Sequence, residues 1–201
     1  MTEIGAELPD FVLQAEDGRQ VRLSDYRDRV VVIETGSISC PMYIQALSGM
    51  NEVRRNHPEV EFLVLYTREA HPGGRMPPFE TIEQKFERAK RLKAEEPEHR
   101  TILVDGMAGE VHDLIGNMPN STVVVGADGR IAFRAQWNDP QALDRALALI
   151  EAGQPADGIE SVYRRPTPPT AICTFKRAGL VSLFDFFIGL PMILYHHWRY
   201  D

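Results

Sequence analysis

A run of mostly β-branched residues, VVVIET at residues 30–35, constrains the fold more than any other feature of the sequence. Such a run is typical of a central strand covered on both faces, because a strand with one wet face alternates polar and apolar residues. Gly36 and Ser37 end the run, and Pro41 fits the first turn of a helix, where its missing N–H is not needed. The sequence therefore predicts a buried strand that leads directly into a helix ending near residue 56.

Strands and helices continue to alternate along the chain. We expect further strands at residues 60–67 and 100–105, and helices at 81–94 and 140–152. Turn signals at Asp17-Gly18 and Asp128-Gly129 predict a hairpin near each end. Alternating strands and helices imply a parallel component, and hairpins add antiparallel edges. The predicted fold class is α/β, a mixed central sheet flanked by helices.

Composition and charge exclude several classes of protein. Of the 201 residues, 43% are hydrophobic and 25% charged, which is typical of a globular chain. The net charge of −7 without a basic stripe argues against nucleic-acid binding. Two distant cysteines make neither a disulfide framework nor a zinc site. The N-terminus lacks the pattern of a signal peptide, so we expect a cytoplasmic protein whose thiols stay reduced.

The chain changes character after Gly153, and three regions are predicted. Residues 1–153 form the α/β domain, 154–175 a Pro/Gly-rich linker, and 176–201 an apolar helical tail. The eighteen residues between Arg177 and His196 are nearly all apolar, at the short limit for a membrane span. Such a segment must be covered by its own domain, a second subunit or a membrane surface. We expect a homodimer through this tail.

A single thiol, Cys40, stands where the strand gives way to the helix. Free N–H groups and the positive dipole end of a helix stabilise a thiolate, which is the reactive form of cysteine. Ser37 and Ser39 add hydroxyl donors nearby. This placement predicts an activated nucleophile, and the alternative is a small buried hydrophobe. Tyr43 occupies the third position after the cysteine, so no local second thiol is present.

Three segments carry a resemblance to a known family: GSISCPMY at 36–43, FLVLYTREAHPG at 62–73 and MPNSTVVVGADGRIAFRAQW at 118–137. The order of hairpin, strand, cysteine, helix and Met-Pro before a closing hairpin resembles the thioredoxin-like fold. Residues 5–37 look like the opening of redoxins and peroxiredoxins. The more specific similarity is to the iodothyronine deiodinases, over about residues 4–150. Cys40 stands where the animal members carry selenocysteine.

The resemblance and the chemistry together assign roles to individual residues. Cys40 is the expected nucleophile, and His71 the proton donor or anion stabiliser, with Glu69 orienting its ring. The residues expected to stabilise the thiolate or contact substrate are Ser37, Ser39, Pro41, Tyr43, Met118 and Pro119, with Pro119 at the position of the cis-proline of thioredoxin-like proteins. Cys173 could resolve an adduct on Cys40, or be an ordinary linker cysteine.

The resulting functional prediction is a thiol-dependent oxidoreductase. Its cysteine would attack a soft electrophile, such as an aromatic halogen, a peroxide oxygen or a disulfide sulfur. An external thiol such as glutathione or a small dithiol protein would regenerate it, with no resident cofactor or metal. Two alternatives remain open: a non-catalytic redoxin scaffold used for binding and assembly, and a one-cysteine, peroxiredoxin-like peroxidase.

Overall fold

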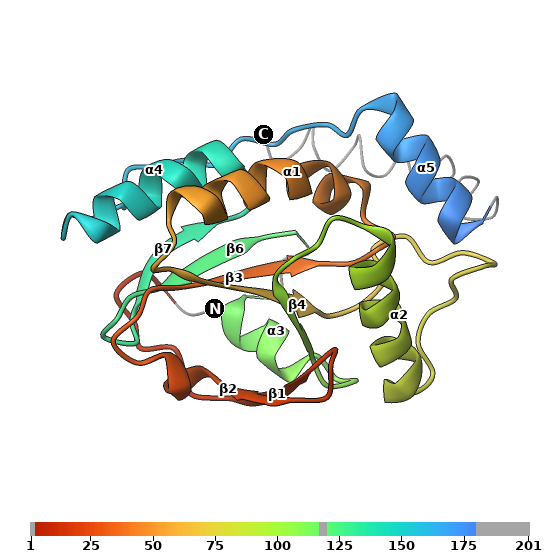
Figure 1. Ribbon diagram of the computed structural model, residues 1–201, viewed down its shortest axis with the longest axis horizontal. Helices are drawn as coiled ribbons and strands as arrows, with labels where there is room; N and C mark the ends of the chain where they lie inside the picture. The colour runs from red at the N-terminus through yellow and green to blue at the C-terminus, as the bar shows by residue number, and fades with distance from the viewer. Residues whose placement is uncertain (1–2, 117–119, 180–201) are drawn as a thin grey trace.

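A seven-stranded sheet forms the centre of the protein, shown in Figure 1 by a computed structural model that describes residues 3–116 and 120–179. The strand order is β2-β1-β5-β4-β3-β6-β7. The strands are β1 (Val12–Ala15), β2 (Gln20–Arg22), β3 (Val31–Gly36), β4 (Glu61–Tyr66), β5 (Thr101–Val104), β6 (Thr122–Val125) and β7 (Ile131–Ala135). The three central strands, β3, β4 and β5, are parallel, whereas both hairpins pair antiparallel. The predicted mixed sheet is confirmed.

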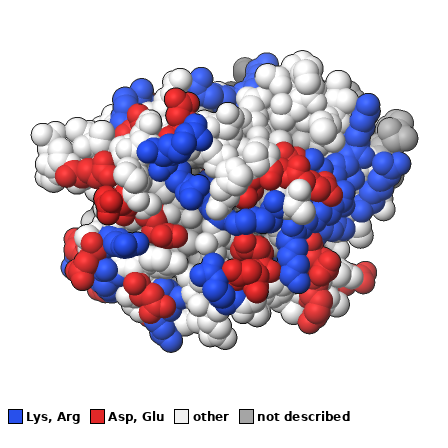
Figure 2. Space-filling model, viewed as in Figure 1, with Lys and Arg blue, Asp and Glu red and all other residues white. Residues whose placement is uncertain are grey.

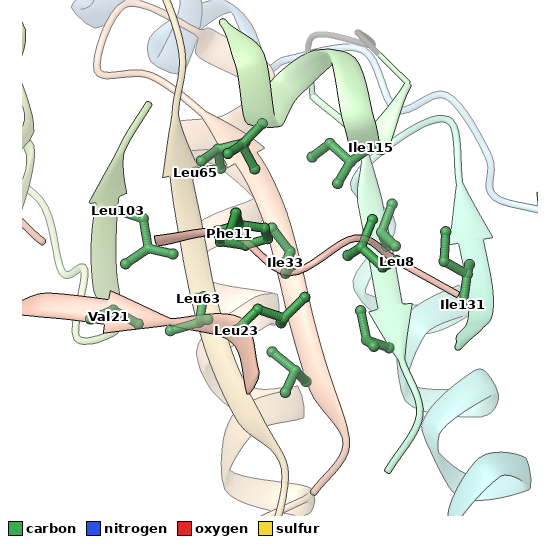
Figure 3. Close-up of a cluster of buried hydrophobic side chains, with 14 of the residues drawn as sticks. Leu8, Phe11, Val21, Leu23, Ile33, Leu63, Leu65, Leu103, Ile115 and Ile131 are labelled. Atoms are coloured by element: carbon green, nitrogen blue, oxygen red, sulfur yellow. The ribbon is translucent and has the colours of Figure 1, made fainter. Parts of the chain in front are cut away.

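The central strand is buried along its whole length, because both faces of the sheet are covered. Ile33, Leu63 and Leu65 face the cluster of apolar side chains drawn in Figure 3. Val32 and Val64, one position along from residues of that cluster, belong to the two clusters on the opposite face. Since neighbouring residues of a strand point to opposite faces, this double cover explains the apolar run at residues 30–35.

Helices α1, α2 and α4 follow the predicted positions closely, whereas α5 was not predicted. They are α1 (Pro41–Asn56), α2 (Ile82–Glu95), α3 (Glu110–Ile115), α4 (Pro140–Glu151) and α5 (Pro168–Ala178), with a 3-10 helix, η1, at Leu23–Tyr26. In Figure 1, α1 and α4 lie side by side over one face of the sheet, and α3 lies on the other. Side chains of α2 share an apolar cluster with α1. Cys40, Thr81 and Asp139 are the N-cap residues of α1, α2 and α4.

Helix α5 corrects the predicted boundaries of the linker and the tail. It begins at Pro168, inside the segment 154–175 that the sequence assigned to a linker. The two prolines occupy its first turn, where they cost no hydrogen bond, so a proline-rich segment can start a helix. Its inner face is buried, with Phe175 and Ala178 among the core residues.

The rest of the predicted tail, residues 180–201, lies outside the described residues. The apolar helix predicted there, and the homodimer predicted through it, remain predictions. Within the part of the chain that the structure describes, no helix combines the length and the apolar character needed to span a membrane.

The crossing of α1 and α4 depends on Gly49, and it yields a first prediction. A Cβ at this position would lie 2.7 Å from Cγ and 2.9 Å from Cβ of Pro140. Cβ atoms in proteins essentially never approach other heavy atoms this closely. Alanine is the better helix former by about 1 kcal/mol. We nevertheless expect Gly49→Ala to lower the free energy of unfolding by about 1–3 kcal/mol, because the proline ring cannot rotate away.

Urea denaturation measures this change in stability. Ser48→Ala is the control, because Ser48 is an exposed neighbour on the same helix. If Gly49→Ala stabilised the protein as a simple gain in helix propensity would, the close crossing would be wrong.

Candidate active site

Cys40 lies at the junction that the sequence predicted, between the end of β3 and the first residue of α1. It is the N-cap residue of α1, and its carbonyl accepts a hydrogen bond from the N–H of Ile44 at 3.0 Å. Its own N–H donates to the carbonyl of Ser37 at 3.1 Å, which closes the turn between strand and helix. The residue is only 7% exposed. Cys40 is therefore a buried cysteine at a helix N-terminus.

The protonation state of Cys40 differs from the expectation. Burial raises the pKa of the thiol to about 11, because a thiolate loses its hydration there. The backbone N–H groups of Tyr43 and Met42, at the start of α1, lower the pKa, whereas the carboxylates of Glu34 and Glu69 raise it. The helix N-terminus thus acts on the sulfur as predicted, but burial outweighs it. At neutral pH the closed site holds a thiol, and the activated nucleophile that the sequence predicts stays a prediction.

The hydroxyl groups of Ser37 and Ser39 bind a neighbouring loop, whereas the sequence predicted that they would donate to the sulfur of Cys40. The Oγ of Ser37 accepts a hydrogen bond from the N–H of Ala70 at 3.2 Å, and the Oγ of Ser39 accepts one from the N–H of His71 at 3.3 Å. The two hydroxyl oxygens lie 3.4 Å apart. Both serines therefore hold the loop after β4 against the turn at residues 37–40, which we call the Cys40 turn. That loop lies close to Cys40, as expected.

The side chain of Tyr43 points into the protein, away from any substrate, whereas its backbone N–H favours the thiolate of Cys40. Its side chain is completely buried, and its hydroxyl donates to Oε2 of Glu98 at 2.5 Å. The ring lies on Gly36, where a Cβ would come within 2.1 Å of a ring carbon. A glycine is required there for that reason. Pro41 is buried in the first turn of α1, as its role in starting the helix requires.

Glu69 is buried and held by partners that the sequence did not suggest. Its Oε1 accepts a hydrogen bond from the hydroxyl of Tyr66 at 2.7 Å, and Nη1 of Arg88 lies 3.6 Å from the same oxygen. The Tyr66 hydroxyl also accepts from the N–H of Ile38, one residue into the Cys40 turn. Glu69 thus braces the turn through Tyr66.

His71 lies half-buried at the edge of the site. Its imidazole meets the ring of Phe175 from α5 edge-on, with 5.4 Å between the ring centroids. Burial lowers the pKa of the imidazole, because the charged form loses hydration. A neutral imidazole is the form that can accept a proton, so His71 is suited first to act as a base and then to return the proton.

The space around the sulfur consists of a small cavity and a nearby groove. The cavity has a volume of about 20 Å³, room for one water-sized group, and Cys40, Ser37, Arg68 and Asn120 are among its lining residues. A groove of about 540 Å³ runs between α1 and α4, and Asn120 lines it too. Sequence reasoning missed the groove, because its walls come from helices far apart in the chain.

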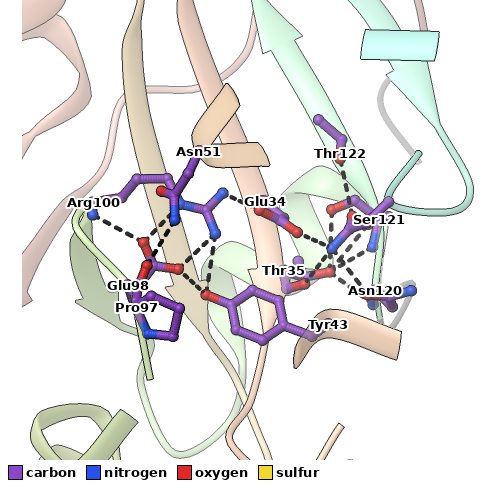
Figure 4. A network of polar contacts seen from close by, with 11 residues as sticks. Glu34, Thr35, Tyr43, Asn51, Pro97, Glu98, Arg100, Asn120, Ser121 and Thr122 are labelled. Atoms are coloured by element: carbon purple, nitrogen blue, oxygen red, sulfur yellow. Dashed lines mark hydrogen bonds and ion pairs between the residues drawn. The ribbon is translucent and has the colours of Figure 1, made fainter. Parts of the chain in front are cut away.

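A buried polar network lies beneath the site (Figure 4). Arg100 pairs with Glu34 of β3 and with Glu98, and all three side chains are at most 1% exposed. The Nη2 of Arg100 also donates to the hydroxyl of Tyr43 at 3.3 Å. Asn138 joins the network on the other side by donating to Glu34.

Burial raises the pKa of Glu34 to about 7, and Arg100 limits that rise. The sequence offered one signal for this network, which is a lone carboxylate inside the apolar run at 30–35. Its partner, Arg100, is 66 positions away and carries no such signal.

The remaining predicted site residues are Cys173, Met118 and Pro119. Cys173 is an exposed residue of α5, and both cysteines are free thiols. A resolving role for Cys173 stays a prediction. Met118 and Pro119 lie outside the described residues, so the predicted cis-proline stays a prediction as well.

The sheet order and the position of the cysteine define the class of fold. A central parallel pair, a cysteine at the start of the helix that follows β3, and a closing antiparallel hairpin make a thioredoxin-like fold, as predicted. No family model and no curated protein matches the sequence. Solved structures do resemble it.

Three solved structures illustrate the likeness. A protein assigned as the thiol:disulfide interchange protein DsbE of Chlorobium tepidum aligns with a TM-score of 0.60 at 18% identity, covering 75% of this chain and 99% of its own. BsSco, a member of the Sco family of cytochrome c oxidase assembly proteins, aligns at 0.55 and 13% identity, covering 76% and 98%. An uncharacterized conserved protein of Geobacillus kaustophilus aligns at 0.62 and 19% identity, covering 83% and 95%. At these identities the likeness shows the fold alone.

The pKa of Glu34 yields a second prediction, on stability against pH. The folded state binds the Glu34 proton more tightly than the unfolded chain, whose pKa is near 4.5. Stability from this group is therefore complete below about pH 4.5 and is lost as the pH rises towards about 7. We expect Glu34→Gln to remove this loss, so that its unfolding free energy falls less over that interval.

Urea denaturation of both proteins across this pH range measures the two slopes. A constant difference in unfolding free energy between the two proteins is expected, since the amide introduced by Glu34→Gln also alters the contact with Arg100. The test therefore compares only how the two free energies change with pH. Parallel curves for the two proteins would contradict the raised pKa of Glu34.

Proposed function

We propose that this protein is a thiol-dependent oxidoreductase whose reactive atom is the sulfur of Cys40. The observation that carries the proposal is the position of Cys40, which is the N-cap residue of α1 and lines a cavity, where the backbone N–H groups of Met42 and Tyr43 lower the pKa of its thiol. These N–H groups are fixed in place before any charge develops, so they stabilise the thiolate formed during reaction. The thioredoxin-like fold and the thiol:disulfide interchange protein among its structural neighbours support the same chemistry.

The proposed reaction begins with transfer of the Cys40 proton to the neutral imidazole of His71. The thiolate then attacks the electrophilic atom of the substrate, so that a new bond to sulfur forms and the bond to the leaving group breaks. The leaving group takes both electrons of that bond and receives the proton from His71. An external thiol attacks the resulting adduct, a second thiol completes the reduction, and the two reducing thiols leave as a disulfide.

Three electrophiles fit this scheme: a disulfide sulfur, a peroxide oxygen and an aromatic halogen. The structural neighbours favour the disulfide, and the small cavity beside the sulfur favours a single oxygen-sized atom. The motifs at residues 36–43 and 62–73 favour the halogen, with cysteine in place of selenocysteine. Turnover of a mixed disulfide, hydrogen peroxide and an iodotyrosine, each with glutathione as reductant, distinguishes the three.

A third prediction tests the nucleophile. We expect Cys40→Ser to abolish turnover of whichever substrate is active, because an alcohol is a far weaker nucleophile than a thiol at this position. The fold should persist, since the change replaces sulfur by oxygen at a residue that needs no disulfide. Initial rates and thermal unfolding are measured on the same preparation. Retention of most of the activity would assign the reaction to another residue.

A fourth prediction tests His71. We expect His71→Ala to lower turnover by roughly 10²-fold, because proton transfer then depends on water. The pH–rate profile should also lose the ionisation that His71 contributes. His99→Ala is the matched control, since His99 is an exposed histidine before β5. An unchanged rate with an unchanged pH profile would leave His71 with a structural role only.

A further inference from the structure

Helix α5 covers the turn that carries the candidate nucleophile. Ala178 of α5 is completely buried in the same apolar cluster as Ile38 and Cys40. Figure 1 shows α5 beside the N-terminal end of α1, at the edge of the sheet where the Cys40 turn lies. The buried state of Cys40 therefore depends in part on a helix that follows the α/β domain in the chain.

One side chain, Arg177, joins α5 to two other parts of the site. Its Nη1 donates to the carbonyl of Ile38 at 3.1 Å, within the Cys40 turn. Its Nε lies 3.2 Å from Oε2 of Glu95, and its Nη2 donates to Glu96. Glu95 and Glu96 are the last residue and the C-cap of α2. Only 12% of the Arg177 side chain is exposed, so these contacts are largely shielded from water and salt.

Further contacts hold the same helix end over the loop after β4. The N–H of Arg75 donates to the carbonyl of Ala178 at 2.9 Å, and Phe175 contacts the ring of His71. Ahead of the helix, Nε2 of Gln45 donates to the carbonyl of Arg165 at 3.0 Å. In Figure 2, basic side chains gather over α5 and its neighbours, with acidic side chains directly beside them.

We propose that Arg177 is a positioning residue that fastens α5 as a lid over Cys40, so that a reagent reaches the sulfur only when the contacts of Arg177 to Ile38 and to the end of α2 are released. The burial of Cys40 agrees with this inference, because only 7% of the residue is exposed while α5 is in place.

The inference concerns regulation of the proposed active site and rests on Cys40 being its reactive atom. The charged groups that act on the sulfur are Glu34 from β3 and Glu69 from the loop after β4. Neither residue hydrogen-bonds to Arg177 among the described residues, so loss of Arg177 changes the cover of the sulfur more than the charges around it.

The experiment measures alkylation of Cys40 by iodoacetamide in the full-length chain. Cys40 and Cys173 fall in different tryptic peptides, so mass spectrometry follows each thiol separately. We expect Arg177→Ala to raise the alkylation rate of Cys40 by roughly tenfold. Loss of the charged hydrogen bonds of Arg177 raises the population of the state in which α5 has opened by about that factor. The rate of the exposed Cys173 should not change.

The pH dependence of alkylation distinguishes a lid from a merely structural residue, because loss of a merely structural residue would not shift the pH profile. In the wild type the rate should rise only towards the raised pKa of about 11. In Arg177→Ala the profile should shift to lower pH, because water that reaches the sulfur stabilises the thiolate. Arg177→Lys should restore part of the wild-type profile, since it keeps the charge but loses the forked geometry of the guanidinium.

Lys176→Ala is the matched control, because Lys176 is the exposed neighbour of Arg177 and loses the same charge. An equal increase in this control, or no increase in Arg177→Ala, would overturn the inference. So would an increase accompanied by faster amide exchange throughout β3 and β4, which indicates global unfolding. If alkylation responds as expected but no electrophile is turned over, the lid stands and the proposed function fails.

Discussion

The buried ion pair between Glu34 and Arg100 is the contact on which the geometry of the site depends. Removal of Arg100 would leave Glu34 buried without its cation, and the loss of one partner of a buried pair typically costs about 3–5 kcal/mol. Arg100 also contacts the hydroxyl of Tyr43, which belongs to α1. The ring of Tyr43 packs on Gly36 at the end of β3. The pair therefore fixes where α1 begins relative to the central strand, and Cys40 lies at that point.

Two opposing effects determine the state of the sulfur, and their magnitudes decide between them. A helix N-terminus stabilises a nearby negative charge by about 0.3–1 kcal/mol, and by up to about 2 kcal/mol in partly buried geometries. Burial of a charge without a paired cation costs several kcal/mol. The carboxylates of Glu34 and Glu69 oppose the thiolate further. Reactivity at Cys40 thus requires the site to open or a substrate to bring compensating contacts.

The sequence predicted what local patterns determine and missed what distant contacts determine. The run at 30–35 and Pro41 placed β3 and α1 within a residue or so, because side-chain periodicity and helix-start chemistry are local. The partnership of Glu34 with Arg100 joins residues 66 positions apart, and no local pattern encodes it. Helix α5 was missed for a different reason. Its prolines are typical of linkers, yet they are equally compatible with a first helical turn.

The residues of the family-like motifs divide into two groups once their contacts are known. Ser37 and Ser39 hold a loop, Tyr43 anchors α1, and Glu69 braces the Cys40 turn through Tyr66. A chain needs these residues to build this edge of the sheet, whatever reaction takes place there. The motif resemblance therefore supports a shared architecture more strongly than a shared substrate. The proposed chemistry rests on Cys40, with His71 as its proton carrier, and a thiol nucleophile suits disulfide, peroxide and halogen substrates alike. Under the proposed function, selectivity among these substrates would come from the groove between α1 and α4 and from the cover that α5 provides.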